Sequence, residues 1–173
     1  MKISFLFVSM VFILASGGET TWRKIIADKN EPGERMIIHG VVLRPDGKTP
    51  APGIRMTVYH TDAKGIYPPQ KPSDGSKPRL RGLLVTNEKG EYEIRTIRPG
   101  AYPGGKNAAH VHFVVHRENG RDRNYTLMFS DDPTLSGRER NAGAGREYTG
   151  DVQKPERTED GSWKIRRDIL LEE

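Results

Sequence analysis

Short stretches in which apolar and polar residues alternate recur along most of this 173-residue chain. In the stretch 54–60, for example, Met56 and Val58 alternate with Arg55 and Thr57. Successive side chains of a strand point to opposite faces, so this pattern is typical of strands that bury one face. Strands of this kind are expected at 35–44, 54–60, 83–86, 91–96, 109–116, 124–129, 147–152 and 163–171.

Helical patterning is missing from the sequence. No window long enough for a helix carries an apolar stripe at helical spacing. Parallel sheets usually need crossover helices, so these strands favour antiparallel pairing. The sequence therefore predicts an all-β fold, namely an antiparallel β-sandwich with Greek-key connections, about eight strands, long functional loops and little helix.

Turn residues separate the expected strands, and the chain contains 19 glycines and 12 prolines. Two longer connections, 63–79 and 131–146, are polar and contain proline or glycine. Connections of that length in a compact domain are usually functional or mobile. The chain length favours one domain, expected at 35–173, after a polar N-terminal arm at 18–34.

Composition excludes several classes of protein. The chain contains no cysteine, which rules out disulfide scaffolds, zinc-thiolate fingers, iron–sulfur clusters and cysteine nucleophiles. Its formal net charge is +5, but the charges are interspersed rather than gathered into blocks. The arginine-rich stretch 138–146 lacks interleaved aromatic side chains, so we interpret it as a solvated loop. Nucleic acid is therefore not an expected partner.

The N-terminus has the layout of a secretory signal peptide. One lysine precedes an apolar run, Ile3 to Ala15, and small residues follow it. As a helix this run would cover about 20 Å, which is less than the hydrocarbon core of a bilayer, so no stable membrane span is expected. We expect a signal peptide at 1–17 with cleavage near Gly17, and a secreted or periplasmic mature protein. An uncleaved N-terminal anchor is the alternative.

The sharpest chemical feature is the pair His110 and His112. Residues two apart in a strand project from the same face, so both imidazoles could bind one metal ion. A pair of surface or partly buried histidines is the simpler interpretation of a bare His-x-His. Because His116 falls on the same face, a three-histidine zinc site for hydrolysis is another alternative, although no carboxylate base is evident nearby in the sequence.

The sequence around this pair resembles the intradiol ring-cleavage dioxygenases, which are non-haem iron(III) enzymes that open catechols between their two hydroxyls. The matching pieces follow one another from about Met36 to Pro133. They are Gly40-Val-Val with its Pro-Asp-Gly turn, Asp62-Ala-Lys-Gly-Ile-Tyr67, Leu80-Arg-Gly82, 86–94, 96–103, His110-Val-His-Phe113 and Phe129-Ser-Asp-Asp-Pro133. The chain lacks a long helical N-terminal region and is most similar to the small secreted branch.

The resemblance implies four ligands for Fe(3+): Tyr67, Tyr102, His110 and His112. By the same analogy Tyr102 and His110 would be axial, whereas Tyr67 and His112 would be equatorial. Fe(III) is a hard Lewis acid, which suits phenolate oxygen, and the bound ion would keep both phenols deprotonated at neutral pH.

The resemblance also implies a reaction. A catechol-type diol would bind the iron, both atoms of O2 would be added to the diol, and the product would be a cis,cis-muconate-type diacid. A homo-oligomer is a possible assembly. Tyr102 would act as a base. Many family members have an arginine where this chain has Asn107, so Lys106 is a candidate for that role, although a lysine lacks the planar fork of arginine. Arg81 is a second candidate for the substrate pocket.

A non-catalytic binding module at the cell surface, similar to transthyretin-like and carboxypeptidase-regulatory-like domains, is the main alternative function. Such a module has no use for two tyrosines directed at two histidines. The position of Tyr67 and Tyr102 relative to His110 and His112 therefore distinguishes the two hypotheses.

Overall fold

A computed structural model gives the fold of this chain. It describes residues 21–67, 78–104, 107–118, 120–140 and 149–172. The predicted signal peptide at 1–17, Lys106, and parts of both predicted long loops lie outside the described residues.

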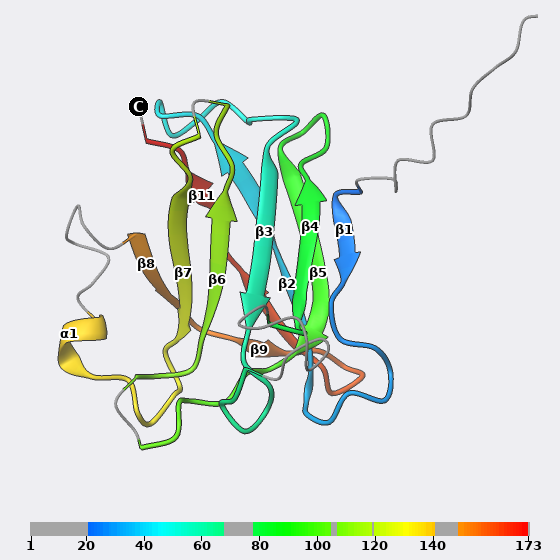
Figure 1. Cartoon of the computed structure of the whole chain (residues 1–173), viewed down its shortest axis with the longest axis vertical. Helices are drawn as coiled ribbons and strands as arrows, with labels where there is room; N and C mark the ends of the chain where they lie inside the picture. The colour runs from blue at the N-terminus through cyan, green and yellow to red at the C-terminus, as the bar shows by residue number, and fades with distance from the viewer. Residues whose placement is uncertain (1–20, 68–77, 105–106, 119, 141–148, 173) are drawn as a thin grey trace, which may run out of the picture.

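The described residues form two β-sheets that pack face to face (Figure 1). The first sheet has the order β1-β5-β2-β10-β9, and β11 also pairs with β2. Its strands are β1 (Arg23–Ile25), β2 (Arg35–Leu43), β5 (Glu91–Ile97), β9 (Glu156–Arg157), β10 (Trp163–Arg166) and β11 (Ile169–Leu170).

The second sheet has the order β4-β3-β6-β7-β8. Its strands are β3 (Arg55–His60), β4 (Arg81–Val85), β6 (His110–Val115), β7 (Arg123–Phe129) and β8 (Thr149–Gln153). Among the described residues there is one helix, the single turn α1 (Gly137–Arg140). None of the helical structure in this part of the chain is long and apolar enough to cross a membrane.

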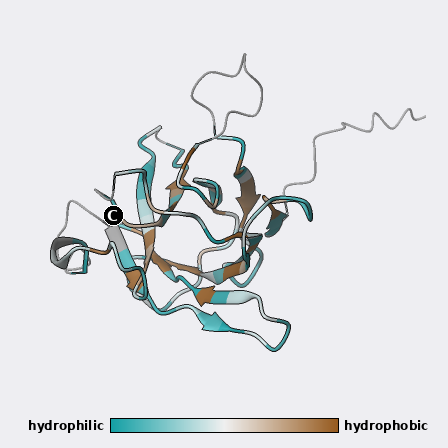
Figure 2. Ribbon diagram, turned by 90° about the horizontal axis from the view of Figure 1, so that it is seen from below, coloured by the Kyte–Doolittle hydropathy of each residue, from teal (hydrophilic) through white to brown (hydrophobic). Residues whose placement is uncertain are grey.

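The core lies between the two sheets. Burial alternates along the whole of β2, which turns Met36, Ile38 and Val42 inward. They join one cluster with the inward residues of the second sheet, and Tyr92 meets Phe113 edge-on at a ring-centroid distance of 5.8 Å. Apolar colour in Figure 2 accordingly lies mainly on the strands, whereas the loops are largely hydrophilic. Burial of these faces is the main favourable term in folding.

The prediction of an all-β sandwich is confirmed, but the sheets are mixed. β1 runs parallel to β5, β8 to β7, and both β10 and β11 to β2. Antiparallel pairing was expected because parallel neighbours in one sheet usually need a crossover helix. Here one partner in each parallel pair is the first strand or one of the late strands β8, β10 and β11. The connection from β7 to β8 includes the single turn α1, and β11 follows β10 after a short connection.

The predicted strand at 163–171 is two short strands. Between them the chain passes over β2 at Gly40, where an added Cβ would lie 1.9 Å from the carbonyl oxygen of Arg167. The Asp168 carboxylate accepts a hydrogen bond from the Val41 N–H at 3.0 Å. A glycine in β2 therefore permits the close crossing that interrupts the last strand.

The described part of the predicted arm adds β1 to the first sheet. The backbone just before it also meets the second sheet, since the Thr21 carbonyl accepts a hydrogen bond from Val85 N–H at 3.3 Å. This segment therefore links the edge strands of the two sheets.

Two connections meet at one end of the sandwich, the lower end in Figure 1. There β3 and β5 end and β6 begins, so the segments that follow His60 and Ile97 lie beside the start of β6. These segments carry the two predicted tyrosine ligands.

Candidate metal centre

His110 and His112 lie on the outward face of β6. Their neighbours Val111 and Phe113 are fully buried, so the two histidines point away from the core. The Nε2 atoms of the two rings are 3.0 Å apart. The expectation that both imidazoles share one face is therefore confirmed.

The loops bring Tyr67 and Tyr102 to the same place. Their hydroxyl oxygens are 2.9 Å apart, and their rings meet edge-on at 5.8 Å. The ring of Tyr102 lies 5.0 Å from that of His110, measured between centroids. Four side chains from three separate segments thus form one cluster.

The spacing of these donor atoms suits a metal ion. Two ligands at right angles, each about 2.0–2.1 Å from one ion, lie about 2.9 Å from each other. The phenol oxygens are 2.9 Å apart and the imidazole nitrogens 3.0 Å apart. Two phenol oxygens with two imidazoles form a donor set that fits a hard, highly charged ion such as Fe(III).

The two tyrosine loops interlock through close backbone contacts. Gly65 has φ +79°, and a Cβ there would lie 1.8 Å from the carbonyl oxygen of Ala101. The Asp62 carboxylate accepts a hydrogen bond from Ile66 N–H at 3.0 Å, and the Asp62 carbonyl accepts one from Gly100 N–H at 2.9 Å. This packing fixes the loop that bears Tyr67 against the loop that bears Tyr102.

His60 supports the same loops from inside the sandwich. Its Nδ1 lies 2.6 Å from the carbonyl oxygen of Thr61, and its Nε2 lies 2.6 Å from Thr96 Oγ1 in the other sheet. The Thr61 hydroxyl donates to the carbonyl of Gly100 at 3.0 Å. Burial lowers the pKa of His60 to about 4, so the ring is a neutral link between the sheets.

Tyr59 is a part of the site that sequence reasoning missed. Its ring stacks on that of His112, with centroids 4.7 Å apart and an interplanar angle of 20°, and lies 6.2 Å from the ring of Tyr67. The signal was present in the sequence, because the alternation in 54–60 places Tyr59 on the outward face. Its alignment with His112 depends on the register of β3 against β6, which the alternation does not specify.

Burial controls the charges in the cluster. It raises the pKa of Tyr67 above the usual range, and the neighbouring Tyr102 hydroxyl raises it further. Burial and then the neighbouring His110 lower the pKa of His112 to about 4. At neutral pH the Tyr67 phenol and the His112 ring are therefore neutral without a metal, and a bound cation would displace the phenol proton.

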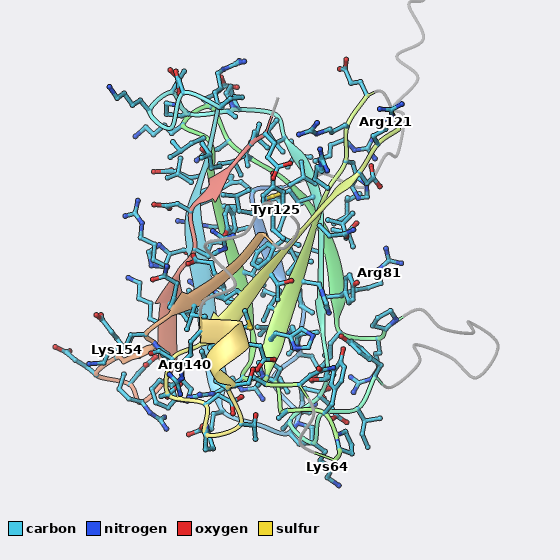
Figure 3. All side chains as sticks on the ribbon, turned by 90° about the vertical axis from the view of Figure 1, so that its left-hand side faces the viewer. Lys64, Arg81, Arg121, Tyr125, Arg140 and Lys154 are labelled. Atoms are coloured by element: carbon cyan, nitrogen blue, oxygen red, sulfur yellow. The ribbon has the colours of Figure 1, made fainter. Side chains whose placement is uncertain are left out.

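Of the other two predicted catalytic residues, Arg81 and Lys106, the structure describes only Arg81. Arg81 pairs with Tyr59 in the sheet, is exposed, and points away from the sandwich (Figure 3). Lys106 lies outside the described residues. Asn107, which follows it, is exposed, and its carbonyl accepts a hydrogen bond from Tyr102 N–H at 3.3 Å.

His116 does not join the other two histidines. Its Nδ1 lies 2.9 Å from an Asp122 carboxylate oxygen, and its Nε2 lies 2.8 Å from the hydroxyl of Thr57. Within the described segments, no three histidine, aspartate or glutamate side chains are placed to hold a metal ion. The three-histidine zinc alternative is therefore not supported, and the side chains of Tyr67 and Tyr102 lie beside the His110–His112 pair.

The sequence matches a known protein family. A family profile described as Dioxygenase matches residues 12–172. The catechol 1,2-dioxygenase 1 of Acinetobacter lwoffii is 30% identical over 129 residues, which cover 65% of this chain and 41% of that protein. The protocatechuate 3,4-dioxygenase beta chain of Burkholderia cepacia is 32% identical over 114 residues, which cover 60% of this chain and 48% of that protein. The chain thus spans less than half the length of these two relatives.

A solved structure shows the same fold. It is the dioxygenase domain of a dioxygenase carbohydrate-binding protein fusion from Streptomyces sp. SirexAA-E, with a TM-score of 0.66 and 21% identity over 90% of each chain. The profile match extends over most of the sequence and includes all four clustered side chains. The chain therefore belongs to the intradiol ring-cleavage dioxygenase family.

Proposed function

We propose that this protein is an intradiol dioxygenase that uses Fe(III) and O2 to cleave a catechol-type diol between its two hydroxyls. The product would be a cis,cis-muconate-type diacid. The observation that carries the proposal is the position of Tyr67 and Tyr102, whose hydroxyls lie 2.9 Å apart beside His110 and His112. A surface-binding module has no use for this arrangement.

Four residues are proposed to hold the ion: Tyr67, Tyr102, His110 and His112. When bound, Fe(III) supplies a Lewis acid that draws electron density from the diol and makes the ring reactive toward O2. The protein contributes a donor set already assembled by interlocked loops and by one strand. Such preorganisation avoids a rearrangement when the metal binds.

Tyr102 is proposed as the base. Its Oη would take the proton of one diol hydroxyl, a role that the family resemblance implies. Support comes from the position of this hydroxyl, 2.9 Å from Tyr67 Oη, within reach of a diol held at the same centre.

Arg81 and Lys106 are proposed to act on the substrate as cations. Arg81 lies in one cross-strand row with Tyr59 and His112, so its Cα is two strand spacings, about 10 Å, from that of His112. A guanidinium at the end of a long side chain could reach a diol substituent on that side.

Export through a signal peptide at 1–17 is part of the same proposal.

Oxygen uptake by the iron-loaded protein tests the proposal. Catechol, protocatechuate and hydroxyquinol would be offered separately, and the products identified by mass. We expect a coloured protein, because phenolate-to-iron(III) charge transfer absorbs visible light, and a diacid that gains both oxygen atoms. His116→Ala is the control, since it removes a histidine from the same strand region but not from the cluster. A colourless, fully iron-loaded protein that consumes no O2 with any diol would contradict the proposal.

A further inference from the structure

A buried carboxylate holds the backbone immediately before β6. Asp132, which follows β7, accepts a hydrogen bond from Ala109 N–H at its Oδ2, at 2.7 Å. This N–H precedes the first pair of the ladder between β6 and β7, His110 with Met128. Asp132 therefore satisfies a buried donor that lies outside this ladder.

The carbonyl of the same peptide group meets a proposed metal ligand. The oxygen of Ala108 lies 2.6 Å from His110 Nδ1. A carbonyl oxygen can only accept, so Nδ1 carries a proton; in the neutral ring Nε2 then presents its lone pair to the site. Metal-binding histidines commonly donate their other N–H to a carboxylate or a backbone carbonyl.

The carboxylate is itself held in one orientation. Its Oδ1 accepts hydrogen bonds from Thr134 N–H at 2.8 Å and from the Thr134 hydroxyl at 2.7 Å. The Asp132 residue is only 6% exposed. Burial acts to raise its pKa, but these hydrogen bonds and that of Ala109 outweigh it and lower the pKa below the usual value. Asp132 is therefore a carboxylate, with Oδ2 directed at the peptide group.

The neighbouring carboxylates have other tasks. Asp131 forms a two-fold contact with the guanidinium of Arg98, at 2.6 and 2.9 Å. Glu139 binds the N–H and hydroxyl of Ser136 at the start of α1, and it reaches Ala108 N–H at the longer distance of 3.2 Å. Only Asp132, among these three, binds the peptide group whose carbonyl faces His110.

We propose that Asp132 is a positioning residue for the metal centre, acting on His110 through the Ala108–Ala109 peptide group. Because hydrogen bonds in a chain polarise one another, a carboxylate on the N–H makes the carbonyl of that peptide a stronger acceptor. The carbonyl then holds the Nδ1 proton and fixes the plane of the imidazole. This inference rests on the proposed metal site.

The tautomer of His110 in the metal-free protein tests the proposal directly. Ring nitrogen chemical shifts from NMR report which nitrogen is protonated. In the parent protein we expect the Nδ1–H form to predominate. Asp132→Asn keeps the size of the side chain but removes the charge, and should increase the Nε2–H share several-fold. Fe(III) affinity should fall by about 10-fold to 100-fold, the usual effect of losing an outer partner of a ligand.

Two matched variants separate this role from a general loss of structure. Asp131→Asn removes the adjacent carboxylate, and Ser136→Ala removes the cap of α1; both should leave the His110 tautomer unchanged. Thr134→Ala loosens Asp132 and should shift the tautomer in the same direction but less, which also provides a test if Asp132→Asn does not fold. An unchanged tautomer in the Asp132 and Thr134 variants, or an equal shift in Asp131→Asn, would overturn the proposal. Because this measurement needs no iron and no diol, its failure is distinguishable from failure of the dioxygenase activity.

Discussion

Histidines lie at the start of β6 and just past its end, and the side chains around them differ completely between the two ends. At the start of the strand, the Nε2 atoms of His110 and His112 lie 3.0 Å apart beside two tyrosines. Past the end of the strand, His116 is bound by the Thr57 hydroxyl at Nε2 and by Asp122 at Nδ1. All three histidines share one alternation, so residue type and face do not distinguish them.

The difference comes from the segments that lie beside each end of β6. Those that follow β3 and β5 reach over the first end and add the phenols of Tyr67 and Tyr102. At the other end, the partners of His116 come from β3 and from the turn that precedes β7, and they use both ring nitrogens. The order Asp122, His116 and Thr57 is that of a hydrolytic triad, but Thr57 is only 7% exposed. A substrate could hardly reach that hydroxyl, so we interpret this end as structural.

Removal of one histidine from each end would test this comparison most strongly. His112→Ala removes a proposed metal ligand that no other described side chain replaces. Iron affinity should therefore fall by more than about 100-fold, which is the upper effect of losing a hydrogen-bond partner of a ligand. His116→Ala loses contacts with Thr57 and Asp122 at a partly exposed position, and should cost about 1 kcal/mol of unfolding free energy. Iron titration followed by absorbance, together with denaturant unfolding, measures both effects. Equal iron affinity in the two variants would show that the two ends do not differ as proposed.

Removal of single hydroxyl groups would distinguish the role of Tyr102 from that of Tyr59 at the first end. Tyr102→Phe should keep iron through the remaining three residues, weaken the visible band and slow turnover by about 100-fold, because a general base is lost. Tyr59→Phe keeps the ring that stacks on His112 and removes a hydroxyl outside the proposed ligand set, so it is the matched control. Turnover at the parent rate in Tyr102→Phe would remove this residue from the proposed role of base.

The face and the order of these residues were predictable, because both follow from local pattern. The alternation in 54–60 and 109–116 predicted which side chains point outward, and the structure confirms it for Tyr59, His110 and His112. The pairing of Tyr67 with Tyr102 was implied by the family resemblance alone. It depends on close packing between the backbones of Gly65 and Ala101, which no local pattern encodes.

The partners of the site were harder to predict than its donors. Asp132 belongs to one of the stretches that carry the family resemblance, and it forms a turn, since its carbonyl accepts a hydrogen bond from Leu135 N–H at 3.1 Å. Its contact with Ala109 spans 23 residues and requires the register of β6 against β7. The mixed pairing of the sheets was missed for the same reason, because it depends on where distant strands return.

The interlocked loops give a prediction about stability as well as metal binding. At Gly65 an alanine would have both a positive φ, +79°, and a Cβ 1.8 Å from the Ala101 carbonyl oxygen, whereas at Gly53 it would have φ +73° with no atom within 4 Å. Gly65→Ala should therefore cost about 4 kcal/mol, from strain and overpacking, and separate Tyr67 from Tyr102. Gly53→Ala should cost about 1 kcal/mol from backbone strain alone. Denaturant unfolding and the visible band of iron-loaded protein measure the two effects. Similar losses in the two variants would mean that the close contact between the loops contributes nothing.

A smaller effect than that of Gly65→Ala concerns a third kind of histidine, the buried His60. Its pKa is lowered from 6.5 to about 4 by burial, so the unfolded chain takes up a proton between these values while the folded chain does not. Stability due to the neutral ring is therefore fully present above pH 6.5 and is lost as the pH falls through about 4. In the metal-free protein, His60 should account for about 2 kcal/mol of the fall in unfolding free energy between pH 7 and pH 5. His60→Gln cannot titrate and should therefore reduce that fall. If His60→Gln and the parent protein lose the same free energy of unfolding between pH 7 and pH 5, the neutral link between the sheets would have to be abandoned.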